Sequence, residues 1–210
     1  MSERPRRGPT RRRMLLAVGA GTVALAGCLG GTEDGAETVP TLGDPDADVT
    51  LEVYEDLGCP ACASYAENGF PAIENNYIEP ASIRYEHRDL ISTANGAEAA
   101  NAAREVFDRH GNEEFWAFKT ALLPEHGRLE SDPLGTIEET AGELDLDADA
   151  VVDAASDGTH QDDIDADVER AQSLGAGVTP SFVVDGSLVG EGAGSGTLQS
   201  VAAELDDALQ

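Results

Sequence analysis

The chain has 210 residues, with 13 basic and 41 acidic side chains and a formal net charge of −28. So large an excess of carboxylates repels nucleic acid and anionic lipid, which excludes both as electrostatic partners. Apolar residues make up 40% of the chain and recur periodically, which favours a folded domain over a disordered acidic chain. An acidic surface of this kind is typical of halophilic proteins, because concentrated salt screens the repulsion between like charges.

Residues 1–28 are typical of an export signal. Six of the 13 basic residues precede an apolar stretch from Met14 to Gly27, and Thr10 to Leu15 resembles a twin-arginine (Tat) motif. The apolar stretch is shorter than the ~20 residues that a membrane-spanning helix needs. It ends in a pattern that resembles a lipobox, so we expect cleavage before Cys28 and a lipid anchor on its sulfur. The alternative is an uncleaved anchor that contains a chance cysteine.

Residues 29–47 are rich in Gly, Thr, Asp, Glu and Pro, which predicts a flexible acidic tether. Residues 48–210 then form the predicted domain. Alternating apolar residues predict strands over 49–54 and 81–88, and a hairpin of strands 181–184 and 188–189. Helical periodicity predicts a helix after Cys62 that bends or breaks near Gly69 to Pro71, and helices over 97–107, 113–123, 137–144 and 148–155. It also predicts a helix capped by Thr159 and Asp162 that ends at Gly175, and a last helix that buries Leu198, Val201, Leu205 and Leu209.

A Cys-x-x-Cys pair, Cys59-Pro60-Ala61-Cys62, lies where the first strand passes into the first helix. At the start of a helix, unpaired N–H groups and the helix dipole favour a thiolate on the first cysteine. The second cysteine lies one turn further on, close enough for a disulfide. A dithiol redox site needs this arrangement.

Two structural explanations compete with the redox reading. A structural disulfide here would close a very short loop, which gives little stabilisation in the chain-entropy model. A zinc site needs four ligands, but there is no second Cys-x-x-Cys and the four histidines are scattered, so no metal and no cofactor are expected. The aromatic cluster Phe115, Trp116 and Phe118 is predicted to form helix core rather than a docking patch.

The Cys-x-x-Cys pair, the sequence Val178-Thr179-Pro180 before a returning strand, and the order of elements together resemble the thioredoxin superfamily, in particular its DsbA-like branch. The resemblance implies an α/β thioredoxin-like fold, a central mixed sheet flanked by helices, with a helical insertion at about 92–174. It also implies that Cys59 is the nucleophile and Cys62 the resolving cysteine. Thr179 and a cis Pro180 would then present backbone to a docking substrate.

One departure from the family concerns a buried acid. Many members carry it six residues before the nucleophile, where this chain has Val53, and the neighbouring Glu52 lies on the opposite face of the strand. We therefore do not assign the acid's proton-transfer role here. Asp56 is interpreted as a residue that caps or braces the loop before Cys59.

These features predict a haloarchaeal-type exported lipoprotein that is anchored to the outer face of the cytoplasmic membrane and acts as a thiol–disulfide oxidoreductase. Its partners would be exported cysteine-containing proteins and a membrane redox partner. Pro60 and Ala61 are the residues that tune the pair, and with no charge between the cysteines the direction of exchange stays open. The alternatives are a reductase dedicated to one cytochrome or copper-site partner, and a non-catalytic thioredoxin-like binding module.

Overall fold

A computed structural model describes residues 39–210. The predicted export signal, Cys28 and most of the predicted tether lie outside the described residues. Within the described part, no helix combines the length and apolar character needed to cross a membrane.

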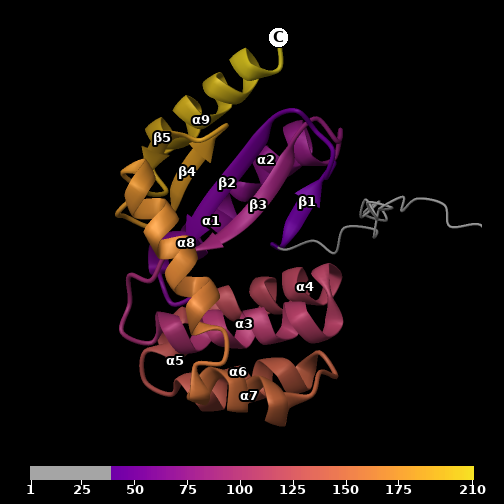
Figure 1. Cartoon of the computed structure of the whole chain (residues 1–210), viewed down its shortest axis with the longest axis vertical. Helices are drawn as coiled ribbons and strands as arrows, with labels where there is room; N and C mark the ends of the chain where they lie inside the picture. The colour runs from indigo at the N-terminus through magenta and orange to yellow at the C-terminus, as the bar shows by residue number, and fades with distance from the viewer. Residues whose placement is uncertain (1–38) are drawn as a thin grey trace, which may run out of the picture. The chain divides into compact units, whose positions relative to one another are not determined.

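A five-stranded mixed sheet forms the centre of the domain (Figure 1). Its strands lie in the order β1-β3-β2-β4-β5, and β2 and β3 are the parallel pair. The predicted strands and hairpin are confirmed within one to three residues at their ends. The strands are β1 (Thr41–Gly43), β2 (Thr50–Glu55), β3 (Arg84–Asp89), β4 (Ser181–Val184) and β5 (Ser187–Glu191).

The tether prediction is wrong for residues 41–43, because they form β1 and pair antiparallel with β3. The side chain of Asn112 fixes this short edge strand. Its Oδ1 accepts from the Thr41 N–H at 2.9 Å, and its Nδ2 donates to the Thr41 carbonyl at 2.6 Å. A strand of three residues is therefore held by a side chain far away in the sequence.

The predicted helices are all present, and the bend or break predicted near Gly69 to Pro71 is a break at Gly69 that separates α1 from α2. A short π-helix, η1, follows α2, and a short 3-10 helix, η2, follows α4. The helical elements are α1 (Pro60–Asn68), α2 (Phe70–Ile73), η1 (Glu74–Ile78), α3 (Gly96–His110), α4 (Asn112–Leu122), η2 (Leu123–Glu125), α5 (His126–Leu129), α6 (Pro133–Glu143), α7 (Ala148–Asp157), α8 (Gln161–Leu174) and α9 (Ser195–Ala208).

The two faces of the sheet bury different helices, because side chains alternate along each strand. Leu51, Val53 and Phe182 pack with α1, α2 and α9 on one face. Tyr54 and Val183 pack with α8 on the other. Figure 1 shows α8 crossing the sheet, while α3, α4, α6 and α7 gather beyond the end of β3.

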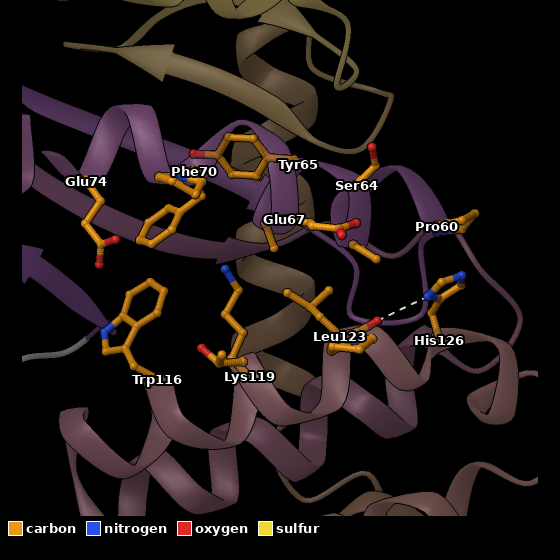
Figure 2. Close-up of a pocket in the computed structure, with 15 residues that line it drawn as sticks. Pro60, Ser64, Tyr65, Glu67, Phe70, Glu74, Trp116, Lys119, Leu123 and His126 are labelled. Carbon is orange, nitrogen blue, oxygen red and sulfur yellow. Dashed lines mark hydrogen bonds between the residues drawn. The ribbon is translucent and has the colours of Figure 1, made fainter. Parts of the chain in front are cut away.

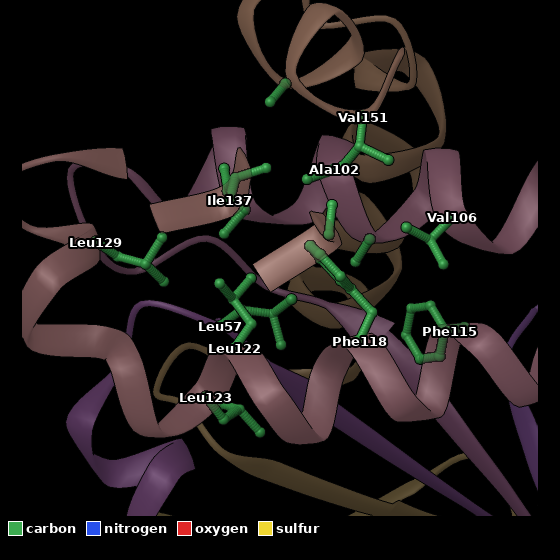
Figure 3. Packing of buried hydrophobic residues seen from close by; sticks show 14 of the residues in the cluster. Leu57, Ala102, Val106, Phe115, Phe118, Leu122, Leu123, Leu129, Ile137 and Val151 are labelled. Atoms are coloured by element: carbon green, nitrogen blue, oxygen red, sulfur yellow. The ribbon is translucent and has the colours of Figure 1, made fainter. Parts of the chain in front are cut away.

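The helical insertion has its own core, formed by α3, α4, α6 and α7 (Figure 3). Phe115 and Phe118 are buried in it, which confirms their predicted role as helix core. Leu57 and Cys62 belong to the same cluster. The insertion therefore packs directly against the Cys-x-x-Cys segment.

Two details of the helix predictions are wrong. Thr159 does not cap α8; its N–H donates to the Ala154 carbonyl and completes the end of α7 after the left-handed Gly158. The N-terminal cap of α8 is His160, which makes no side-chain capping bond. Leu209, predicted to be buried, is 42% exposed because α9 ends before it.

We expect Leu122→Ala to lower the free energy of unfolding by about 2–5 kcal/mol, because it opens a cavity in the core of the insertion. Leu122 has no exposed surface. Urea unfolding of the purified domain measures the change. Leu209→Ala is the matched control and should change stability by less than about 0.5 kcal/mol; equal losses in both variants would contradict this packing.

Candidate active site

Cys59 is the N-cap of α1, and Pro60 occupies the first helical turn, where its missing N–H costs no hydrogen bond. Cys59 is 9% exposed, whereas Cys62 is fully buried one turn later. Both are free thiols in the structure. The first sulfur therefore keeps a small exposed surface, whereas the second keeps none.

The two sulfurs have opposite electrostatic environments. A hydrogen bond from the Cys62 thiol, assisted by Thr179 and by backbone N–H groups of α1, outweighs burial and lowers the pKa of Cys59 to about 5. Donating that hydrogen bond raises the pKa of Cys62 far above its ordinary value, and burial and the nearby Glu55 carboxylate raise it further. Near pH 7 the pair thus holds one thiolate and one thiol.

The predicted Thr-Pro turn lies beside Cys59. The Thr179 carbonyl oxygen is 3.9 Å from the Cys59 sulfur, and the Thr179–Pro180 bond is cis, as expected. Val178, the residue before Thr179, is 53% exposed. The carboxylate of Glu191 accepts from the N–H groups of Gly177 and Val178, which fixes the loop before the turn. Backbone of this loop is therefore presented next to the reactive sulfur.

Asp56 braces the site, as interpreted from the sequence. Its buried carboxylate accepts from the N–H of Gly58 at 2.8 Å and from the N–H groups of Ser92 and Thr93 at 2.7 and 2.6 Å. The Ser92 hydroxyl in turn lies 2.8 Å from the Thr179 hydroxyl. Asp56 thereby connects the Cys59 loop, the segment after β3 and the Thr-Pro turn.

Glu55, which was not predicted as a site residue, lies fully buried at the end of β2. Its Oε2 accepts from the Lys119 ammonium and lies 3.3 Å from Nδ1 of His87. Although burial raises the pKa of Glu55, the charge of Lys119 and the hydrogen bond from His87 bring it below its ordinary value. One feature of the sequence could have indicated this buried ion pair: Lys119 is the only lysine of the chain and lies next to the aromatic residues Trp116 and Phe118.

A groove of about 780 Å³ runs between α1 and α4 (Figure 2). Pro60 lines it at one end, and Phe70 and Trp116 line it at the other. Lys119 points into the space between Trp116 and Leu123, so the groove reaches the ammonium that pairs with Glu55. Trp116 is therefore the member of the aromatic cluster that faces this opening.

The comparisons with known proteins agree with this geometry. Residues 35–204 match the family described as thioredoxin. The chain belongs to the thioredoxin family. Its DsbA-like fold with a helical insertion, predicted from the sequence, is confirmed by solved structures.

The oxidised BdbD structure from Bacillus subtilis aligns with a TM-score of 0.72 at 20% identity, over 81% of this chain and 92% of that one. Alpha-DsbA1 of Wolbachia pipientis aligns with a TM-score of 0.66 at 22% identity, over 83% and 96%. At these identities the likeness is one of fold. Disulfide bond formation protein D of Bacillus subtilis is 26% identical over 93 residues, which span 44% of this chain but only 42% of that relative.

The pKa of Cys59 can be measured directly. We expect its alkylation rate to rise with pH about a midpoint near 5, because the thiolate reacts and its pKa is about 5. Cys62→Ala should move the midpoint upward, since it removes the largest stabilising hydrogen bond. A Cys59 midpoint near that of an ordinary thiol, or one insensitive to Cys62→Ala, would contradict this account of the site.

Proposed function

We propose that this thioredoxin-family chain is an extracytoplasmic thiol–disulfide oxidoreductase that acts on exported cysteine-containing proteins. The observation that carries the proposal is the Cys59 thiolate at the start of α1, with its low pKa, beside the Thr179 backbone. A structural disulfide would have no use for this difference between its two sulfurs. The printed name of the Bacillus subtilis relative, a disulfide bond formation protein, supports the same class of reaction.

In the oxidising direction, a client thiolate attacks the Cys59 sulfur of the Cys59–Cys62 disulfide. A bond forms between the client sulfur and Cys59, and Cys62 leaves as a thiolate that takes up a proton. A second client thiolate then attacks the mixed disulfide, so the client gains a disulfide and Cys59 leaves as a thiolate. The low pKa of Cys59 makes it a good leaving group in this last step.

The environment of Cys59 favours the oxidising direction. A thiolate stabilised in the reduced protein makes the disulfide easier to reduce and hence a stronger oxidant. A pKa of about 5 lies between the values of about 7 for thioredoxin and 3.5 for DsbA. A membrane redox partner would then reoxidise the reduced Cys59–Cys62 pair.

The export signal and lipobox pattern of residues 1–28 support a place on the outer face of the cytoplasmic membrane, anchored through Cys28. Twin-arginine export carries folded proteins, which suits an acidic domain that folds in concentrated salt. Disulfides form in that compartment, so a dithiol oxidant would meet unpaired client cysteines there.

We expect the reduction potential of the purified domain to lie between roughly −270 mV, the thioredoxin value, and roughly −120 mV, the DsbA value. Equilibration with glutathione buffers of known ratio measures it. A potential at or below the thioredoxin value would favour the alternative function, a reductase dedicated to one cytochrome or copper-site partner.

Trapping tests the reaction itself. Cys59→Ser should abolish exchange because it removes the nucleophile. Cys62→Ser should accumulate mixed disulfides because it lacks the intramolecular thiol that releases the client. Many different clients trapped on Cys62→Ser would support a general oxidant, whereas a single client would indicate a dedicated partner. Exchange that survives in Cys59→Ser would overturn the mechanism. A wild-type Cys59 that resists alkylation after mild reduction would favour the binding module.

A further inference from the structure

The hairpin of β4 and β5 contains a shift in register that places one acidic residue beside the Thr-Pro turn. Ser181 lies opposite Glu191, whereas Val183 lies opposite Leu188, so the register changes by one residue between the two pairs. Without that shift, Gly190 would lie opposite Ser181. Bulges of this kind re-aim a side chain. The shift therefore brings Glu191 level with the residue that follows the cis proline.

One oxygen of Glu191 holds the loop that precedes the turn. Its Oε1 accepts from the N–H of Gly177 at 2.8 Å and from the N–H of Val178 at 3.0 Å. The hydroxyl of the fully buried Ser181 lies 3.2 Å from the same oxygen and donates to the Val178 carbonyl. Side chains thus bind both backbone polar groups of Val178.

The loop between α8 and the turn has little conformational preference of its own. It contains Gly175 and Gly177, and glycine restricts the backbone less than any other residue. A loop that is already rigid in its binding conformation binds more tightly, because less freedom is lost on association. The hydrogen bonds to Glu191 supply that rigidity here.

The Val178 side chain is left uncovered although its backbone is held. It is 53% exposed, and the only other large hydrophobic side chain so exposed among residues 39–210 is Leu209, beyond the end of α9. Val178 precedes Thr179, whose carbonyl oxygen is 3.9 Å from the Cys59 sulfur. One residue of extended chain spans only ~3.3 Å, so a client whose cysteine meets Cys59 brings its neighbouring side chains close to Val178.

We propose that Glu191 is a positioning residue for client docking: it fixes the backbone of Gly177 and Val178, so that the Val178 side chain meets an apolar side chain next to the client cysteine. Both apolar surfaces lose contact with water when they meet, which favours such clients. The inference rests on the thiol–disulfide exchange proposed above and adds a preference among its clients. Glu191 acts through the loop and not on the reacting sulfurs.

Two matched peptides test this preference. Each carries two cysteines, and the residues on either side of each cysteine are leucine in one peptide and serine in the other. The measurement is kcat and KM for the oxidation of each peptide by the oxidised protein. Both peptides are measured on the same preparation, so the ratio of their kcat/KM values does not depend on the fraction of folded protein.

We expect the wild type to prefer the leucine peptide about tenfold in kcat/KM, mainly through KM, because covering apolar surface strengthens binding. Val178→Ser should bring the ratio close to one, since it removes the apolar contact. Glu191→Ala should do the same because it releases the loop, whereas Glu191→Gln keeps an oxygen acceptor and should retain most of the preference. Glu204→Ala, at an exposed acid of α9, is the matched control and should match the wild type.

The double variant of Val178→Ser and Glu191→Ala shows whether the two residues act together. We expect it to lose no more of the preference than either single variant, because residues that act through one contact are not additive. A Glu191→Ala protein that keeps the wild-type ratio would overturn the positioning role.

Measurements on the wild-type protein keep the test independent of folding in the variants. Amide hydrogen exchange at Gly177 and Val178 should be slow, because both N–H groups donate to Glu191, and exchange as fast as in an unstructured chain would overturn the inference. Equal kcat/KM for the two peptides, in a wild type that oxidises both, refutes this inference alone. A wild type that oxidises neither peptide refutes the proposed function.

Discussion

The buried ion pair between Glu55 and Lys119 joins the two halves of the molecule. A carboxylate without exposed surface stays ionised only when it is paired, and removing one partner of such a pair typically costs about 3–5 kcal/mol. Glu55 ends β2 of the sheet, and Lys119 belongs to α4 of the insertion. The insertion therefore supplies the counter-charge for an acid that lies beside the second sulfur. Its packing on Leu57 and Cys62 follows from the same docking.

The Glu55–Lys119 pair follows a general pattern in this domain, where basic residues are scarce and each one contacts a carboxylate. Residues 39–210 contain seven basic side chains, and each of them lies within 4.0 Å of a carboxylate. Several of these contacts neutralise carboxylates that are almost completely buried, including Glu52 and Asp89. Salt screens exposed charges at distances beyond a few ångströms but acts weakly on buried pairs. The acidic surface and the paired interior can therefore coexist in concentrated salt.

The features that could be predicted from the sequence are local ones. They are the strand before Cys59, the break near Gly69 to Pro71 and the hairpin, and each depends on a few neighbouring residues with known backbone preferences. The features that were missed depend on distant partners: β1 needs Asn112, and Glu55 needs Lys119. Thr159 shows how a local pattern misleads, because the end of α7 uses the same N–H that a capping box at the start of α8 would need.

Side chains alternate along β2, which explains how this chain keeps an acid near Cys62. Val53 occupies the position six residues before the first cysteine, where the resemblance to the family would place a buried acid. Glu52, one residue earlier, turns to the α8 face, where Arg170 binds both its oxygens. Glu55, two residues after Val53, returns to the face that carries α1 and α4. A shift by two positions preserves the side of the sheet but changes the partners, because here the acid meets His87 and a lysine from the insertion. The electrostatic role of the acid can thus move along a strand by even steps, provided that the new position finds a cation.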